Sequence, residues 1–176
     1  MPRRAVLSIA AKEEKRKGTE ANMEKVSKIQ TIMDDKNGQL AIIIRADHQG
    51  EGIEFVTGSE CEQQLAYMSH PQGTDICPHV HKQVHREIDN TREILVIKKG
   101  CYRVDFYSEE KQYLKSCIVR TGDVILLLSN AHGFKALEDT ELYEIKQGPF
   151  AEGMDKEKFD FHLQKVIYEN EEETYS

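Results

Sequence analysis

The sequence predicts an all-β protein that folds as one antiparallel sandwich or barrel. From Leu40 onward, short runs rich in β-branched and aromatic residues follow one another at regular spacing, and turn signals separate them. No helical pattern lies between these runs, which argues against a parallel α/β fold, where helices connect the strands. The 176 residues are enough for a single domain with a sizeable core and two tails.

The first of nine predicted strands begins soon after the Asn37-Gly38 break. The expected ranges are 40–46, 52–57, 63–69, 92–99, 101–107, 113–120, 124–128, 132–137 and 141–147. Turn sequences separate neighbouring strands, among them Gln49-Gly-Glu-Gly, His70-Pro-Gln-Gly and Thr121-Gly-Asp. The residues expected in the core of these strands include Val104, Phe106, Ile125 and Leu127.

The two ends of the chain differ from this middle part. Residues 1–37 are predicted to form a polar N-terminal extension, partly helical or disordered, and the barrel is expected at 38–150. The helix is expected within residues 11–36, where four apolar side chains recur at helical spacing: Val26, Ile29, Ile32 and Met33. Residues 151–176 are predicted to form a C-terminal helix or extended arm, over 155–166, and then an acidic tail.

Charge and composition limit the class of partner. The net charge of −7 argues against nucleic acid, which favours a basic face, and no apolar run approaches the roughly eighteen residues that span a bilayer. The apolar patch after Arg4 is too short for a working signal peptide, so we expect a cytoplasmic protein with reduced cysteines, and Met23 remains an alternative start. Exposed sheet edges are commonly covered by a partner chain, which favours a homodimer.

Four side chains are candidates to hold one divalent metal ion: His79, His81, Glu93 and His132. In an extended strand, residues i and i+2 point to the same face, so His79 and His81 can both reach one ion. Glu93 begins a strand with an apolar inward face, where a carboxylate is costly unless a cation pairs with it. His132 follows an apolar strand and a tight Ser-Asn-Ala corner, which delivers it to the same end of the barrel.

These residues match the two motifs of the cupin superfamily. The first motif runs Gly, five residues, His-x-His, a short gap, Glu, six residues, Gly, and its outer spacings are met by Gly73, His79, His81, Glu93 and Gly100. The gap from His81 to Glu93 departs from the family, because eleven residues stand where the family has a short gap. Glu87, inside this longer gap, therefore remains an alternative to Glu93.

The second motif runs Gly, five residues, Pro-x-Gly, two residues, His. Gly122 and His132 match its ends, while Leu128 stands at the proline position, Asn130 at the glycine position, and the corner is one residue short. A closer resemblance to a bacterial cupin family covers most of residues 40–160. It is carried by runs such as Pro78-His-Val-His, Thr91-Arg-Glu-Ile-Leu-Val-Ile, Gly122-Asp-Val-Ile-Leu-Leu and Glu144-Ile-Lys-Gln-Gly-Pro-Phe.

This resemblance implies a fold more strongly than a reaction. It implies the jelly-roll barrel of the cupins, a double-stranded β-helix, with short helical extensions at both ends of this chain. The family that the chain resembles is linked to nucleotide-sugar and surface-polysaccharide functions and has no firm reaction of its own. Because one fold serves many functions, the chemistry must be argued from the site itself.

Three imidazoles and a carboxylate leave one or two positions open on an octahedral ion. Such nitrogen-rich ligands suit Fe(II), Mn(II), Ni(II) or Zn(II), whereas Mg and Ca prefer oxygen ligands. Open coordination beside an apolar wall can polarise a carbonyl of a small oxygen-rich metabolite. We therefore expect a metal-dependent enzyme, either a dioxygenase or a sugar isomerase or epimerase. The alternative is a non-catalytic protein that uses the metal to bind or sense a small ligand.

Further candidates surround the predicted metal. The insertion before Glu93 is expected to overhang the barrel mouth, where its basic side chains can bind a carboxylate or phosphate: Lys82, His85, Arg86 and Arg92. The alternative is a solvated charged loop. On the last strand, Glu144 and Lys146 share a face, either as inward polar groups or as a surface ion pair. The candidate catalytic residues are therefore His85, Glu144 and Lys146.

Overall fold

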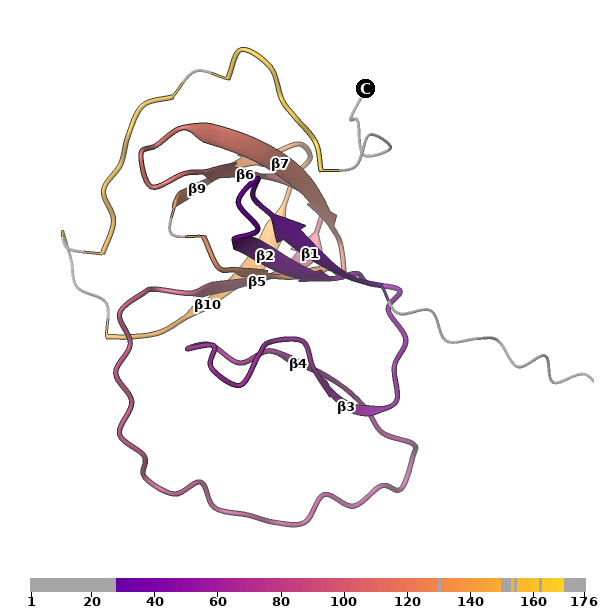
Figure 1. Cartoon of the computed structure of the whole chain (residues 1–176). Coiled ribbons are helices and arrows are strands. Elements are labelled where there is room, and N and C mark those ends of the chain that lie inside the picture. Colours follow the sequence, from indigo (N-terminus) through magenta and orange to yellow (C-terminus); the bar gives the residue numbers. More distant parts are fainter. Residues whose placement is uncertain (1–27, 130, 150–152, 154, 162, 170–176) are drawn as a thin grey trace, which may run out of the picture.

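The computed structural model describes residues 28–129, 131–149, 153, 155–161 and 163–169. This part of the chain is all-β, with ten strands and no helix, and so with none that could cross a membrane (Figure 1). The strands pair only in antiparallel fashion. They are β1 (Ile29–Met33), β2 (Gln39–Ile44), β3 (Gly52–Phe55), β4 (Ala66–Ser69), β5 (Glu93–Lys99), β6 (Cys101–Tyr107), β7 (Tyr113–Arg120), β8 (Val124–Leu127), β9 (Ala131–Ala136) and β10 (Glu141–Lys146).

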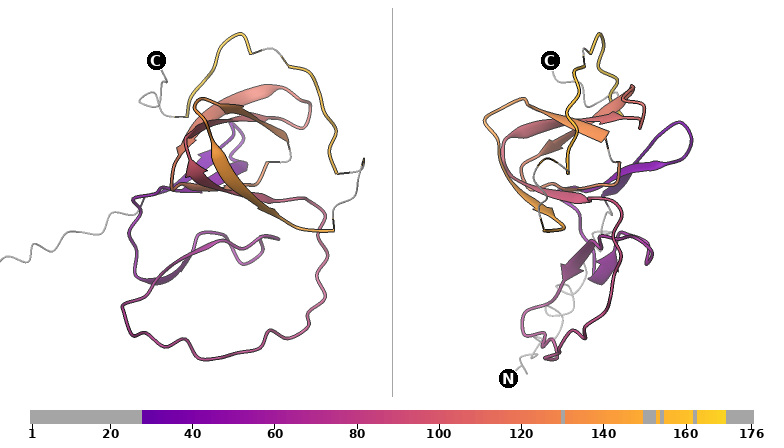
Figure 2. Two further views of the ribbon diagram at one scale, coloured as in Figure 1. Left: turned by 180° about the vertical axis from the view of Figure 1, so that it is seen from behind. Right: turned by 90° about the vertical axis from the view of Figure 1, so that its left-hand side faces the viewer.

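Two sheets face each other and enclose the core (Figures 1 and 2). One has five strands in the order β1-β2-β8-β5-β10, and the other has three in the order β7-β6-β9. Because alternate residues of a strand share a face, Ile43, Leu95 and Ile125 of the first sheet meet Val104 and Phe106 of the second, and all five are buried. The two-stranded sheet β3-β4 lies apart from this sandwich in both figures.

All nine strands predicted from the sequence are confirmed, and β6 and β7 have the predicted bounds. The four residues predicted to lie in the core are buried as well. The turn residues help to fix these bounds. At Gly100, between β5 and β6, φ is +87° and a Cβ atom would lie 2.4 Å from the carbonyl oxygen of Asp139, so this turn requires glycine.

The helix predicted within residues 11–36 is wrong where the structure describes it. Residues Ile29–Met33 form β1, which pairs with β2 and places Ile32 in the core. The helical spacing of these apolar residues is a local pattern, and pairing with a neighbouring strand outweighs it. Val26 and the rest of that prediction lie outside the described residues. The five-stranded sheet therefore begins ahead of residue 38, the predicted start of the barrel.

The described residues of the C-terminal region form an extended arm and no helix. We name residues 155–161 and 163–169 the C-terminal strap. It passes over the three-stranded sheet (Figure 1), where Phe159 and Phe161 pack against Tyr107, and Tyr168 forms a parallel bridge with Ser116 of β7. The strap is extended because its contacts are spread along the outer face of the sheet, which a helix of this length could not follow.

Residues 70–92 join β4 to β5 and contain no strand; we name them the β4–β5 connection. They run in a wide arc away from the two facing sheets (Figure 1), and residues 70–89 are all exposed. Connections of this length without secondary structure are uncommon in compact domains and are often functional.

Candidate metal centre

Glu93 is an acidic side chain at the end of the apolar core. It is the first residue of β5 and shares a face with Leu95 and Ile97, which point toward the three-stranded sheet. Its register partners are Leu127 of β8 and Lys146 of β10, so it lies between two neighbouring strands, and only 3% of it is exposed. A carboxylate this deeply buried requires a cation or several hydrogen-bond donors around it.

His132 meets Glu93 from the opposite sheet. It lies on β9 beside Phe106 of β6. Its Nε2 atom is 3.0 Å from Glu93 Oε2, and its Nδ1 atom is 3.4 Å from the carbonyl oxygen of Ser129. Both ring nitrogens therefore face oxygen acceptors. Such an arrangement requires a proton on each nitrogen or a cation between Nε2 and the carboxylate.

Two lysines complete the surroundings of Glu93. Lys156 of the C-terminal strap places Nζ 3.0 Å from Glu93 Oε1, and Lys146 of β10 places Nζ 3.9 Å from the same oxygen. The hydrogen bond from His132 lowers the pKa of Glu93 most. Burial raises this pKa, but the hydrogen bond from Lys156 lowers it further, and the result is a pKa of about 2. Glu93 is therefore an ionised carboxylate near neutral pH, enclosed by one histidine and two ammonium groups.

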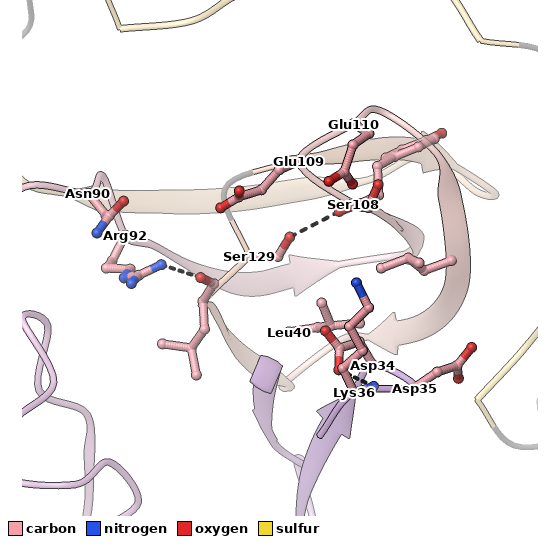
Figure 3. A pocket seen from close by; sticks show the side chains of 13 residues that line it. Asp34, Asp35, Lys36, Leu40, Asn90, Arg92, Ser108, Glu109, Glu110 and Ser129 are labelled. Carbon is pink, nitrogen blue, oxygen red and sulfur yellow. Dashed lines mark hydrogen bonds between the residues drawn. The ribbon is translucent and has the colours of Figure 1, made fainter. Parts of the chain in front are cut away.

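Cavities open at this end of the two sheets. One of ≈ 360 Å³ lies beside the Glu93–His132 pair, and its lining includes Thr91, Glu93, Lys111, His132, Lys156 and Phe159. A second cavity, of ≈ 600 Å³, shares Glu109 with the first. Figure 3 shows its polar rim, which the β1–β2 turn supplies with Asp34, Asp35 and Lys36. This end of the sandwich therefore has room for a small polar molecule.

His79 and His81, the other two predicted ligands, lie on the β4–β5 connection. Both are exposed, their ring centroids are 5.1 Å apart, and Nδ1 of His79 is 3.0 Å from the carbonyl oxygen of Cys77. Among the residues that the structure describes, no group of three or more His, Cys, Asp and Glu side chains is placed to hold one ion. The structure thus brings together Glu93 and His132 and leaves the histidine pair apart from them. Burial does not hold the connection against the sheets, because its residues 70–89 are all exposed.

The candidate catalytic residues divide between the same two locations. His85 lies on the exposed connection, 3.7 Å from Glu87. Glu144 and Lys146 form an ion pair of 3.0 Å on the face of β10 that also carries Leu142 against the core. Lys146 also approaches Glu93 on this face of β10. The Glu144–Lys146 ion pair therefore lies at the edge of the candidate site.

The basic residues of the predicted insertion also lie in two different places. Lys82 and Arg86 are exposed on the connection. Arg92 instead lies against the sheets, where it donates a hydrogen bond to the carbonyl oxygen of Leu128 and is 3.5 Å from Glu62. Arg92 lines the larger cavity together with Leu128, so its side chain belongs to the concave end of the molecule.

The chain was compared with known families and known structures. No protein-family model, no curated protein and no solved structure matches it. The cupin resemblance therefore rests on the motifs and runs of the sequence alone, and the metal and its chemistry stay predictions.

Lys156 is the residue of this site that carries no sequence signal. It lies in a run of alternating charges, Asp155-Lys-Glu-Lys, which is typical of a solvated surface. Its contact with Glu93 arises because the C-terminal strap returns to the open end of the sheets. Such a return depends on tertiary packing, which the spacing of charged residues does not reveal.

Proposed function

We propose that this chain is a metal-binding protein of the cupin jelly-roll type, and that one divalent transition metal ion binds between Glu93 and His132. The observation that carries this proposal is the 3.0 Å approach of His132 Nε2 to the buried Glu93 carboxylate. When the proton of His132 lies on Nδ1 and forms a hydrogen bond to the Ser129 carbonyl oxygen, Nε2 presents a lone pair to the carboxylate. A cation between the two groups then removes their repulsion.

The spacing and the chemistry of the two donors support the proposal. Nitrogen and oxygen ligands lie about 2.0–2.2 Å from an ion such as Zn(II), so two ligands at right angles on one ion are about 3 Å apart. Imidazole with carboxylate suits Fe(II), Mn(II), Ni(II) or Zn(II). Two protein donors are fewer than such sites use, and we therefore include His79 and His81 in the proposed ligand set.

The pattern of the β4–β5 connection supports this inclusion. Its large apolar residues are highly exposed and all even-numbered, namely Ile76 (63%), Val80 (86%), Val84 (57%) and Ile88 (44%). In an extended segment, His79 and His81 lie on the opposite face from these residues. A face rich in apolar side chains is typical of a strand with one side buried. Lys82 and Arg86 share this face, and their apolar stems can lie along it while their charged groups stay in water. We propose that the connection leaves the arc of Figure 1 when metal binds, buries its apolar face and adds His79 and His81 to the site.

A bound ion would polarise a carbonyl or enolate oxygen of a small ligand. The chain's own residues would bind and enclose that ligand. Lys146 offers an ammonium group to its anionic oxygens, and the ≈ 360 Å³ cavity limits its size to that of a small metabolite. These features favour an enzyme on an oxygen-rich metabolite, of dioxygenase or sugar isomerase or epimerase type. A metal-dependent binding or sensing protein has the same site without turnover.

A metal-independent function is the second candidate, and one observation favours it. The ammonium group of Lys156 lies 3.0 Å from Glu93 Oε1 and already compensates its charge. In this case Glu93 and His132 would act as a hydrogen-bonded pair that binds a polar ligand or exchanges a proton with it.

Metal content separates the two candidates. The untagged full chain is loaded in turn with Fe(II), Mn(II), Ni(II) and Zn(II) and then desalted. Its metal content is measured by inductively coupled plasma mass spectrometry. We expect about one ion per wild-type chain, and loss of that ion from Glu93→Gln, from His132→Ala and from the double variant His79→Ala/His81→Ala. His70→Ala, another exposed histidine, serves as the matched control and should retain the ion. Wild-type chains without metal, or metal retained by His132→Ala, would rule out the proposed site.

Turnover separates an enzyme from a sensor. The anaerobically loaded Fe(II) protein is screened for oxygen uptake with small diketones and thiols, and the other metal forms are screened for isomerisation of nucleotide sugars. Product formation that His132→Ala abolishes supports the enzyme. Ligand binding without turnover in both screens supports the sensor.

A further inference from the structure

Lys156 reaches the Glu93 carboxylate from a distant part of the chain. The two carboxylate oxygens have different partners, because Oε2 faces His132 at 3.0 Å and Oε1 faces the Lys156 ammonium group at 3.0 Å. The Lys156 side chain is 52% exposed, so the ammonium group approaches the buried carboxylate from the solvent side. Lys156 therefore stands where an incoming cation would approach Glu93.

The position of Lys156 is fixed by the C-terminal strap. Just after Lys156 in the chain, Glu157 forms an ion pair of 2.6 Å with Lys111, and Phe159 packs against Tyr107 at the outer face of the sheet. Farther along, the strap is tied to Ser116 of β7, whose amide donates to the Ile167 carbonyl at 2.7 Å and whose carbonyl accepts from the Glu169 amide at 3.0 Å. These contacts are independent of Glu93. Docking of the strap therefore keeps the ammonium group at a high local concentration beside the carboxylate.

An ammonium group and a divalent ion cannot share one carboxylate without repulsion. Like charges a few ångströms apart repel strongly when water is largely excluded, and Glu93 is only 3% exposed. Lys146 adds to the positive charge, with its Nζ 3.9 Å from Glu93 Oε1, although its bond of 3.0 Å to Glu144 offsets part of it. Lys156, in contrast, comes from the C-terminal strap, which contributes no strand to either of the two facing sheets.

We propose that Lys156 is a tethered counter-ion that competes with the divalent metal for Glu93, and that docking of the C-terminal strap sets the strength of this competition. The inference rests on the proposed metal site. Because coupling between two sites is reciprocal, metal binding must weaken strap docking by the same factor by which the docked strap weakens metal binding. The strap therefore acts as a built-in regulator of metal occupancy.

The first test measures the affinity of the full chain for Zn(II) by calorimetry. Replacement Lys156→Met removes the charge and retains the apolar stem, and we expect about tenfold tighter binding, within the usual range for directly contacting groups. Lys156→Arg retains the charge and should bind like wild type. Lys158→Met, an exposed lysine of the same strap, is the matched control and should change the affinity less than twofold. Glu157→Gln loosens the strap beside Lys156 and should tighten binding to a smaller extent.

The second test measures strap docking without reference to activity. The Ser116 and Glu169 amides form the bonds that hold the strap to β7, so their hydrogen exchange reports its release. Zn(II) should accelerate exchange of both amides in wild type, and this effect should be smaller in Lys156→Met.

The outcomes separate this inference from the metal site itself. Tighter Zn(II) binding by Lys156→Met than by wild type supports both. Equal affinities of wild type and Lys156→Met, with binding lost in His132→Ala, overturn the competition and leave the metal site in place. Absence of binding in every variant overturns both proposals. Both are also overturned if Zn(II) binds only at other residues and leaves the hydrogen exchange of the two amides unchanged.

Discussion

Replacement of Asp105 by Asn should destabilise the protein more than any surface charge change. Asp105 lies on the outer face of β6, 1% exposed, beneath the C-terminal strap. It accepts hydrogen bonds from Arg103 Nε at 2.7 Å and Arg103 Nη2 at 2.9 Å, and a third from Ser116 Oγ at 2.5 Å. The variant keeps the size of the side chain but removes its charge. The Arg103 guanidinium group, with a side chain 10% exposed, then lacks its counter-charge.

The expected cost follows from this geometry. Removal of one partner from a buried ion pair costs about 3–5 kcal/mol, because the remaining charge stays buried. We expect a loss near the lower end, about 3 kcal/mol, since the amide oxygen of Asn still accepts one of the bonds. Urea unfolding followed by far-ultraviolet circular dichroism measures this loss as a lower midpoint at an unchanged slope. Asp47→Asn, which removes an exposed ion pair with Lys28, should change the midpoint little.

A double-mutant cycle with Arg103→Met isolates the pair. Asp105→Asn should cost far less when Arg103 is already Met, since no buried charge is then left without a partner. A loss below about 1 kcal/mol for Asp105→Asn, or equal losses with and without Arg103, would refute the buried ion pair. Either result would also argue against the polar network of Asp105 and Ser116 to which the strap is tied.

Two further predictions concern stability. Burial raises the pKa of Tyr107 to about 12, so the unfolded chain loses this proton first as the pH rises above 10, and stability should fall between pH 10 and 12. Tyr107→Phe should flatten that fall in a series of urea titrations, and an unchanged fall would contradict it. Gly100→Ala should cost at least about 2 kcal/mol, because positive φ and a clash with a backbone oxygen combine, whereas Gly73→Ala, with open space at its Cβ, should cost at most about 1 kcal/mol. Equal thermal shifts for the two glycine variants would argue against the tight turn before β6.

The strands were predictable because their signals are local. In β6, Val104 and Phe106 alternate with Arg103 and Asp105, and the structure buries the first pair in the core and places the second on the outer face. In β1, by contrast, the apolar residues follow helical spacing, and only pairing with β2 reveals a strand. The sequence pattern does not contain that pairing, because it depends on the register of the neighbouring strand.

The candidate site was predictable only in part. Glu93 begins the apolar strand β5, and His132 follows the apolar strand β8 after a short corner. The two facing sheets bring them together. The place of His79 and His81 depends on how a long connection packs, which period-2 alternation alone does not decide. Lys156 depends on a strap that returns across the three-stranded sheet, so neither motif nor spacing points to it.

The most direct test of the metal site is an anomalous-scattering map of crystals of the full chain grown with Zn(II). The account predicts one strong peak about 2 Å from both His132 Nε2 and Glu93 Oε2, with the Lys156 ammonium group displaced from the carboxylate. A map with no peak at this position, and with Lys156 still bonded to Glu93, would contradict it.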